Sequence, residues 1–211
     1  MYTRLRDAIS KLGTTAYVPG SSASGGWLYN PLPFPGCDKF PCHRKNSPER
    51  WNLISTNLKG KRVLDIGCAT GYFSFKAALA GASIVVGIDH DPAAIEVCNV
   101  AATIFDVPNV QFEHMVVVTP PSQKYDVVFA MAILNWMGRE RAEEWLDWIV
   151  VNESEAWIEM PLKGDGRRGA HWLTTDPEVE KWLKGFFPTV ERVGKTYGAH
   201  CRRWRSLWKC R

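Results

Sequence analysis

Short apolar runs alternate with stretches of helical periodicity from Lys61 to the end of the chain. The apolar runs predict strands over 62–66, 83–88, 110–115, 125–130, 154–160, 188–194 and 202–210. Helices are predicted between them over 71–80, 92–104, 139–149 and 176–185. Strands that alternate with helices are typical of βαβ units and a mostly parallel sheet, so the expected fold class is α/β.

The first 46 residues follow a different pattern. Four apolar residues are spaced as on one face of a short helix: Tyr2, Leu5, Ile9 and Leu12. Residues 18–46 are rich in Gly, Ser and Pro but contain aromatic side chains, which is typical of a functional lid or a linker. A second helix is predicted to begin at Ser47, with a buried stripe of Trp51, Ile54 and Leu58. We therefore divide the chain into an N-terminal helix with a lid-like loop, 1–46, and a main domain, 47–211.

The composition limits the class of protein. The chain has 211 residues, of which 45% are hydrophobic and 23% charged, as expected of one globular domain. No run of 18 apolar residues is present, and Met1–Tyr17 lacks the apolar centre of a signal peptide, so we expect a cytoplasmic protein without membrane insertion. Its six cysteines are expected to be reduced thiols. Cys37, Cys42 and His43 are close in sequence without an evident fourth ligand; we predict no metal site, and the sequence leaves open whether these three bind one.

Positive charge is concentrated at the two ends. Residues 1–62 contain ten Lys and Arg against three Asp and Glu, and residues 200–211 contain five against none. Period-two alternation along the last strand predicts a basic face made of Arg203, Arg205, Lys209 and Arg211. Arg44, Lys45 and Arg50 are expected to extend this stripe. It indicates either contact with an anionic partner or ordinary solvated charge.

The most informative stretch joins the first strand to the next helix. It reads Asp65-Ile-Gly67-Cys-Ala-Thr-Gly71, and Asp89 follows at the end of the second strand. A glycine-bearing turn of this kind lets the backbone approach a ligand closely at the carboxyl edge of the sheet, and Asp89 lies where a ribose diol would be bound. The turn lacks the G-x-G-x-x-G spacing of dinucleotide sites, which disfavours a nicotinamide oxidoreductase. An acid inside the turn suits a cationic ligand such as S-adenosylmethionine (SAM).

This stretch resembles the first motif of class I SAM-dependent methyltransferases, and the resemblance covers residues 61 to about 135. Ala69 replaces the middle glycine of the family pattern. Glu49–Ile54 is similar to a helix of wobble-uridine tRNA methyltransferases and of O-antigen-terminating methyltransferases, and Arg205–Cys210 is similar to the last strand of the latter. The resemblance implies a Rossmann-like, doubly wound, seven-stranded, mostly parallel sheet with an antiparallel last strand.

The resemblance also implies residue roles. The residues expected to bind SAM are Asp65, Gly67, Cys68, Ala69, Gly71, Asp89, His90, Met115, Ala130 and Met131. The residues expected on the substrate side are Arg50, Asn135 and Trp136. Glu159, His171 and His200 are candidate general bases, because ligands of such sheets gather beyond the carboxyl strand ends. A base is needed only if the acceptor must lose a proton.

The acceptor is the least determined part of the prediction. We expect a polar or anionic small molecule or glycan, because the pI of 8.7 is below that of dedicated nucleic-acid binders. Methylation of RNA, in particular tRNA, is the alternative, and a non-catalytic SAM-fold binding protein is the second alternative. The sequence does not fix the acceptor atom or the oligomeric state.

Overall fold

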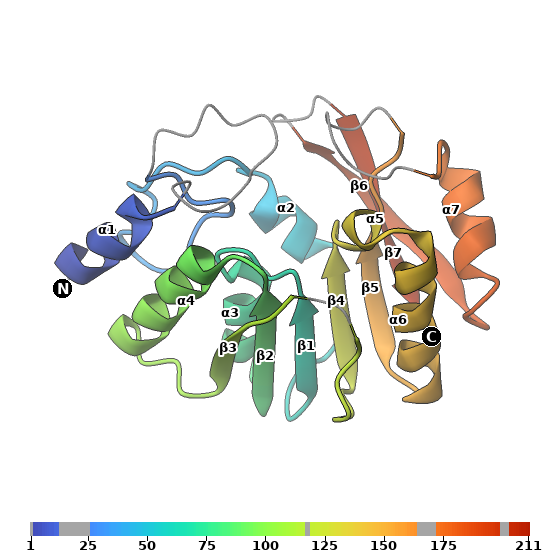
Figure 1. Cartoon of the computed structure of the whole chain (residues 1–211), viewed down its shortest axis with the longest axis horizontal. Helices are drawn as coiled ribbons and strands as arrows, with labels where there is room; N and C mark the ends of the chain where they lie inside the picture. Colours follow the sequence, from blue (N-terminus) through green and yellow to red (C-terminus); the bar gives the residue numbers. More distant parts are fainter. Residues whose placement is uncertain (1, 13–25, 117–118, 164–171, 199–202) are drawn as a thin grey trace.

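The computed structural model describes residues 2–12, 26–116, 119–163, 172–198 and 203–211. One seven-stranded sheet runs through them in the order β3-β2-β1-β4-β5-β7-β6 (Figure 1). Its strands are β1 Arg62–Ile66, β2 Ile84–Asp89, β3 Val110–His114, β4 Val127–Met131, β5 Glu155–Glu159, β6 Val190–Gly198 and β7 Arg203–Cys210. Strands β3, β2, β1, β4 and β5 are parallel to one another, whereas β7 is antiparallel to both β5 and β6. The predicted fold class, including the antiparallel last strand, is confirmed.

Seven helices are assigned in the described residues. They are α1 Tyr2–Ser10, α2 Ser47–Asn52, α3 Tyr72–Leu79, α4 Pro92–Ile104, α5 Leu134–Met137, α6 Arg139–Val151 and α7 Asp176–Leu183. Helices α4 and α7 start where a side-chain oxygen, from Asp91 or Thr175, accepts a backbone N–H of the first turn. Helix α2 is shorter than predicted, so Ile54 and Leu58 lie beyond its end. The short α5 was not predicted, because four residues are too few to show a periodic pattern.

Helices cover both faces of the sheet, as in a doubly wound fold. Val63 and Val85 face a hydrophobic cluster that includes buried residues of α1, α3 and α4. Their neighbours Leu64 and Val86 face a second cluster that includes residues of α6 and α7. Helix α1 packs on α4 (Figure 1). Its Leu5 side chain is fully buried. The N-terminal helix therefore shares a core with the main domain.

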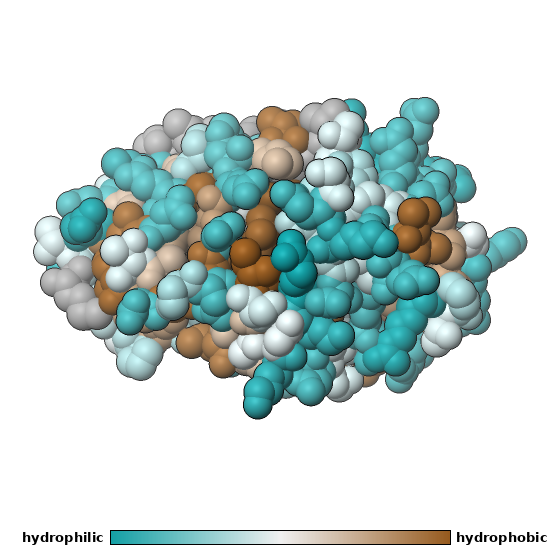
Figure 2. Space-filling model, turned by 90° about the horizontal axis from the view of Figure 1, so that it is seen from below, coloured by the Kyte–Doolittle hydropathy of each residue, from teal (hydrophilic) through white to brown (hydrophobic). Residues whose placement is uncertain are grey.

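The carboxyl ends of the parallel strands meet at one edge of the sheet, the upper edge in Figure 1, where α2 also lies. The strand order reverses there between β1 and β4, which makes this the position where open α/β sheets bind ligands. The opposite edge, seen in Figure 2, is mostly hydrophilic with small separate hydrophobic patches. In the described part of the chain, no helix is long and apolar enough to cross a bilayer.

The prediction of a continuous basic stripe along the last strand is wrong. Strand β7 lies between β5 and β6 and is covered on both faces over most of its length, so Arg205 is only 8% exposed. Trp204, which the same alternation places opposite the basic face and so on the core side, is 63% exposed. Arg44 and Arg50, which were to extend the stripe, are each 1% exposed. These three arginines therefore lie inside the protein, where charge must be compensated.

Candidate functional site

The turn after β1 is tightly wound and pinned to β2. The backbone N–H groups of Gly67 and Cys68 both donate to the carbonyl oxygen of Ile88, at 2.8 and 3.0 Å. Gly67 and Gly71 have φ angles of 69° and 76°, and a Cβ on Gly67 would lie 2.8 Å from the Ile133 side chain. Both positions therefore need glycine. Ala69 has a φ of 49°, so the residue that replaces the family's middle glycine still adopts a left-handed conformation.

Asp65, the acid of the turn, is buried at the end of β1. Its Oδ2 accepts a hydrogen bond from Ser74 Oγ of α3 at 2.6 Å. Burial raises the pKa of this carboxyl group to about 7, because the charged form loses its hydration. A cation bound next to Asp65 would favour the ionised form. The turn thus offers an acid whose charge is available to a positively charged ligand.

Asp89 links the end of β2 to the same turn. Its Oδ2 accepts from the backbone N–H of Ala69 at 2.7 Å, and its Oδ1 accepts from that of Asp91 at 2.9 Å. His90 Nδ1 lies 3.2 Å from Oδ1, and this hydrogen bond raises the pKa of the imidazole. A carboxylate oxygen has two lone pairs, so Oδ2 has capacity for a further donor such as a ribose hydroxyl.

The other predicted cofactor residues lie along the same edge. Met115 N donates to the carbonyl oxygen of Asp89 at 2.9 Å, directly after β3. Ala130 and Met131 form the carboxyl end of β4, and both are buried. The turn residues, Asp89, Met115 and the end of β4 are therefore gathered at the carboxyl ends of four adjacent strands. These residues fit the cationic and ribose groups of SAM, and their individual roles stay predictions.

Glu159, the last residue of β5, is surrounded by guanidinium groups. Its Oε1 lies 2.8 Å from Arg44 Nη2 and 3.1 Å from Arg205 Nη1, and its Oε2 lies 2.6 Å from Arg50 Nε. Burial alone would raise the pKa of Glu159, but the three arginines, Arg50 foremost, outweigh it and hold the pKa well below its usual value. A carboxylate held in this way is a poor proton acceptor. Its geometry favours positioning the arginines over general-base catalysis.

The arginine partners of Glu159 were missed in the sequence. Arg44 lies in the loop before α2, Arg50 in α2 and Arg205 in β7, so no local spacing connects them. Glu159 at the end of a buried strand was itself a signal for such partners, because a buried carboxylate requires a compensating charge. The sequence could have predicted that partners exist, but not which of the chain's arginines they are.

Asn135 and Trp136, the predicted substrate residues of α5, have different surroundings. Asn135 is 1% exposed, and its Oδ1 has no hydrogen-bond partner among the described residues. Trp136 is 49% exposed. His171 and His200, the two histidines proposed as bases, lie outside the described residues.

The cysteine-rich part of the N-terminal loop contains buried thiols. Leu28 forms an isolated bridge with Cys42, and burial raises the pKa of the Cys37 thiol to about 11. In the described ranges, no group of three or more His, Cys, Asp and Glu side chains is arranged to hold a metal ion. The Cys37 and Cys42 side chains belong to the hydrophobic cluster beneath the loop.

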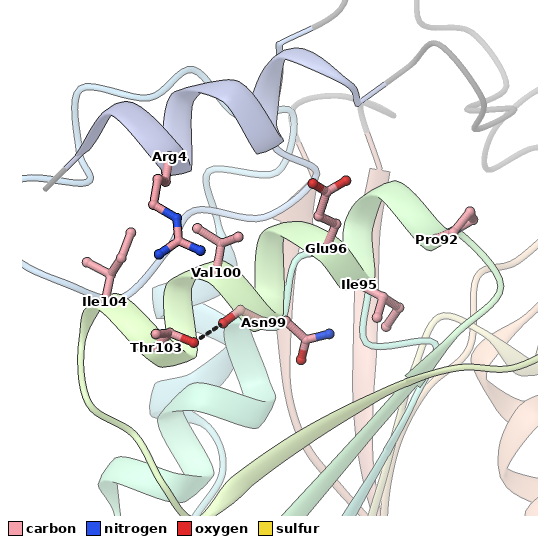
Figure 3. A pocket seen from close by; sticks show the side chains of 8 residues that line it. All are labelled: Arg4, Pro92, Ile95, Glu96, Asn99, Val100, Thr103 and Ile104. Atoms are coloured by element: carbon pink, nitrogen blue, oxygen red, sulfur yellow. Dashed lines mark hydrogen bonds between the residues drawn. The ribbon is translucent and has the colours of Figure 1, made fainter.

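A separate hollow of about 410 Å³ lies between α1 and α4. Figure 3 shows that Arg4 reaches it from α1, and that its other lining residues come from α4. Thr103 Oγ1 donates to the carbonyl oxygen of Asn99 inside it, and Glu96 pairs with Lys11 nearby. The hollow lies on the outer side of α4, apart from the turn and Asp89.

Comparison with known proteins agrees with this geometry. Residues 57–144, which run from before β1 into α6, match the family model described as a methyltransferase domain. This segment of the chain is therefore similar to a methyltransferase domain. The match includes the turn, Asp89 and the end of β4, so it covers the proposed cofactor side of the site.

The curated relatives are larger proteins. A tRNA U34 carboxymethyltransferase of Pseudomonas putida (strain GB-1) is 34% identical over 160 residues, which are 66% of this chain and 49% of the relative. One from Ectopseudomonas mendocina (strain ymp) is 28% identical over 156 residues, or 64% of this chain and 48% of that protein. The chain thus spans about half the length of the curated relatives it matches.

Solved structures share the fold at low sequence identity. The bifunctional kinase-methyltransferase WbdD aligns over 98% of this chain and 45% of its own, with a TM-score of 0.74 and 17% identity. Magnesium protoporphyrin IX methyltransferase (ChlM) from Synechocystis PCC 6803, with bound SAM, aligns over 78% of this chain and 76% of its own, with a TM-score of 0.60 and 19% identity. The likeness to WbdD extends through β6 and β7 and includes the N-terminal region.

Proposed function

We propose that the protein is a SAM-dependent methyltransferase that acts on a polar or anionic acceptor. The observation that supports this most directly is the unit formed by the Asp65–Gly71 turn and Asp89, joined by the hydrogen bond from Ala69 N to Asp89 Oδ2. It lies within the segment that matches a methyltransferase domain. ChlM, which has the same fold, was crystallised with SAM.

SAM would supply a methyl group that is already activated by a sulfonium. In this proposal Asp65 lies near the cationic part of the cofactor, and Asp89 accepts hydrogen bonds from the ribose. The Ile133 side chain packs closely on the backbone of the turn, because Gly67 has no Cβ. The chain then contributes mainly by positioning SAM and the acceptor, and less by acid–base chemistry. Such positioning is sufficient for an in-line displacement.

For the acceptor we favour a small polar or anionic molecule or a glycan. Arg44, Arg50 and Arg205 are buried at the carboxyl edge instead of forming a solvent-exposed stripe. Buried arginines suit one compact anionic group, whereas tracking a nucleic-acid backbone requires cations along an exposed surface. Arg50 and Asn135 are the residues we propose to contact this acceptor, with Trp136 on its exposed side.

A tRNA acceptor is the second candidate, because the relative that is 34% identical is a tRNA U34 carboxymethyltransferase. Binding of bulk tRNA at low and at physiological salt tests this candidate. Tight binding that falls steeply with salt would favour RNA, with a log-log slope of roughly −0.7 per phosphate contact on single strands. A cytoplasmic location stays a prediction under either acceptor.

Transfer of label from methyl-labelled SAM tests the function itself. The purified protein is incubated with fractionated cell extract, and the label is followed into small molecules, glycans, RNA and protein. We expect incorporation into the small-molecule or glycan fraction. Incorporation into RNA would support the second candidate, and SAM binding without transfer to any fraction would favour a non-catalytic binding protein.

A further inference from the structure

The arrangement around Glu159 has more positive than negative charge. Arg44 and Arg50 are each 1% exposed, and both depend on the single Glu159 carboxylate for their ion pair. Arg205 approaches the same carboxylate. Burying a guanidinium group costs much free energy unless its charge is matched. Arg44, Arg50, Arg205 and Glu159 are here called the arginine cluster, and its two most deeply buried guanidinium groups, those of Arg44 and Arg50, share one carboxylate.

In the described part of the chain, other groups near Arg44 and Arg50 do not remove the excess of positive charge on these two residues. The Tyr29 ring lies 5.8 Å from the Arg44 guanidinium, and the Phe73 ring lies 4.7 Å from that of Arg50, but neither contact is an ion pair. Asp65 faces Arg50 at longer range and is hydrogen-bonded to Ser74. Its raised pKa of about 7 leaves it partly protonated at neutral pH. Burial and the neighbouring Arg44 lower the pKa of Arg50 to about 10, whereas for Arg44 the attraction of Glu159 outweighs burial and raises the pKa. Arg50 is therefore the less well compensated of the two.

Unused hydrogen-bond donors point to the same conclusion. Arg44 Nε and Arg50 Nη2 are buried and have no hydrogen-bond partner among the described residues. An unsatisfied buried donor on a charged group is costly, and an arginine fork is suited to paired oxygen atoms. The cluster is adjacent to the carboxyl edge of the sheet, where we propose that SAM binds. Glu159 pairs with Met131 of β4 in the sheet, and the carbonyl oxygen of Glu159 accepts a hydrogen bond from Ala132 N.

We propose that the arginine cluster binds an anionic group, a carboxylate or a phosphate, of a ligand held in the methyl-transfer site. Arg44 Nε and Arg50 Nη2 donate to its oxygens, and Glu159 holds the two guanidinium groups in place. The inference deepens the proposed function, on which it rests for the identity of the site. The anion belongs either to the acceptor or to the amino-acid end of SAM.

Inorganic phosphate is the probe, and it is measured without SAM so that anion binding can be found even if methyl transfer fails. Titration calorimetry and thermal unfolding are compared between sodium phosphate and sodium chloride at equal ionic strength. We expect saturable phosphate binding that raises the melting temperature. Equal melting temperatures in the two salts, with no heat of binding, would overturn the proposal.

Two variants and one control assign the binding to the cluster. Arg50→Gln is expected to weaken phosphate binding at least tenfold, whereas Arg203→Gln, at an exposed position of β7, leaves it unchanged. Glu159→Gln is the complementary variant, because it removes the negative charge that competes with phosphate. It is expected to bind phosphate more tightly, and its melting temperature is expected to rise more on phosphate addition than that of the wild type.

A purely structural cluster would give the opposite result. Glu159→Gln would then lose stability without any gain in phosphate affinity, and this outcome contradicts the proposal even if Arg50→Gln fails to fold. Equal weakening by Arg50→Gln and Arg203→Gln would also contradict it, because the binding would then reflect general surface charge.

The source of the anion is distinguished with S-adenosylhomocysteine and 5′-methylthioadenosine, which lacks the carboxylate. Phosphate binding that persists with saturating S-adenosylhomocysteine supports an anionic acceptor. If S-adenosylhomocysteine displaces phosphate, and Arg50→Gln weakens S-adenosylhomocysteine but not 5′-methylthioadenosine, the anion is the cofactor's carboxylate. Both results support the anion site, and each assigns a different ligand to it.

Discussion

Arg50 Nε donates to Glu159 Oε2 at 2.6 Å, and the two residues are both fully buried although 109 positions separate them in the chain. This contact joins α2, in the segment before the methyltransferase motif, to the carboxyl end of β5. It fixes the N-terminal segment over the edge of the sheet where the turn and Asp89 lie.

Loss of the Glu159 charge should strongly destabilise the protein. Glu159→Gln leaves buried guanidinium groups without their counter-charge, so we expect the free energy of unfolding to fall by about 3–5 kcal/mol. Urea unfolding measures it. The control is Glu180→Gln, which breaks an exposed i,i+4 pair with Lys184 and should cost no more than about 0.5 kcal/mol. A similar loss of unfolding free energy in the two variants would show that the buried ion pairs stabilise the protein no more than an exposed pair does.

Alanine substitutions at Gly60 and Gly67 distinguish the cost of backbone strain from the cost of a steric clash. Both have positive φ, of 74° and 69°, but a Cβ on Gly60 meets no atom within 4 Å, whereas one on Gly67 meets Ile133. Gly60→Ala should therefore cost roughly 1–2 kcal/mol of stability from its φ alone. Gly67→Ala should cost roughly 1–3 kcal/mol more and abolish SAM binding. Unchanged SAM affinity in folded Gly67→Ala would mean that the turn does not approach the cofactor.

Asp65 should make SAM binding depend on pH. Its pKa of about 7 in the ligand-free protein lies above the ordinary value of 3.8, so near neutrality the folded protein holds a proton there. A cationic ligand favours the ionised carboxylate, so binding should release up to about half a proton per SAM at pH 7, and affinity should rise from pH 5 to 8. Calorimetry in two buffers of different ionisation enthalpy measures the release.

The variant Asp65→Asn is the control for this titration. It should bind SAM more weakly, with no proton release and a flat pH profile between 5 and 8. The stability of the ligand-free protein gives a second check. Because the folded pKa is raised, the wild type loses stability as pH rises from about 4 to 7, and Asp65→Asn should not show this loss. Proton release that persists in the variant would place the titrating group elsewhere.

Residues 18–46 are proposed to act as a lid over the acceptor side. Within this stretch, 26–46 are described, and Arg44 contacts Glu159 at the carboxyl edge of the sheet. Lids become ordered when ligands bind, so SAM or S-adenosylhomocysteine should slow tryptic cleavage after Lys39 and Lys45, both of which are exposed. NAD at the same concentration is the control. Equal cleavage rates with and without ligand would count against a lid.

The sequence predicted the sheet, and the position of the turn and Asp89 at its carboxyl edge, because both depend on local signals. The turn from Asp65 to Gly71 and the acid Asp89 follow directly from strand ends, and the structure brings them within hydrogen-bond distance through Ala69 N. The segment matching a methyltransferase domain agrees with this interpretation. The local sequence of such a motif determines the conformation of its turn.

The acceptor side depends on contacts between distant parts of the chain, and there the sequence was misleading. Alternation along the last strand predicted Arg205 on an open face, but pairing of β7 between β5 and β6 buries it. Arg44 and Arg50 were interpreted as surface charge because nothing in the local sequence shows that they pair with Glu159. A buried charge network becomes visible only when the strand order is known.

The most direct test of the account is calorimetric titration of the protein with SAM, S-adenosylhomocysteine and NAD, repeated on Asp89→Ala. We expect one molar equivalent of SAM or S-adenosylhomocysteine to bind and NAD not to bind. Asp89→Ala should lose roughly 1–3 kcal/mol of SAM binding, or about 5- to 150-fold in Kd, because the ribose loses a charged acceptor. Glu96→Gln, on the outer side of α4, is the control and should leave the affinity unchanged. Binding of NAD in place of SAM, or an unchanged SAM affinity in a folded Asp89→Ala protein, would contradict the assignment of this edge as a SAM site.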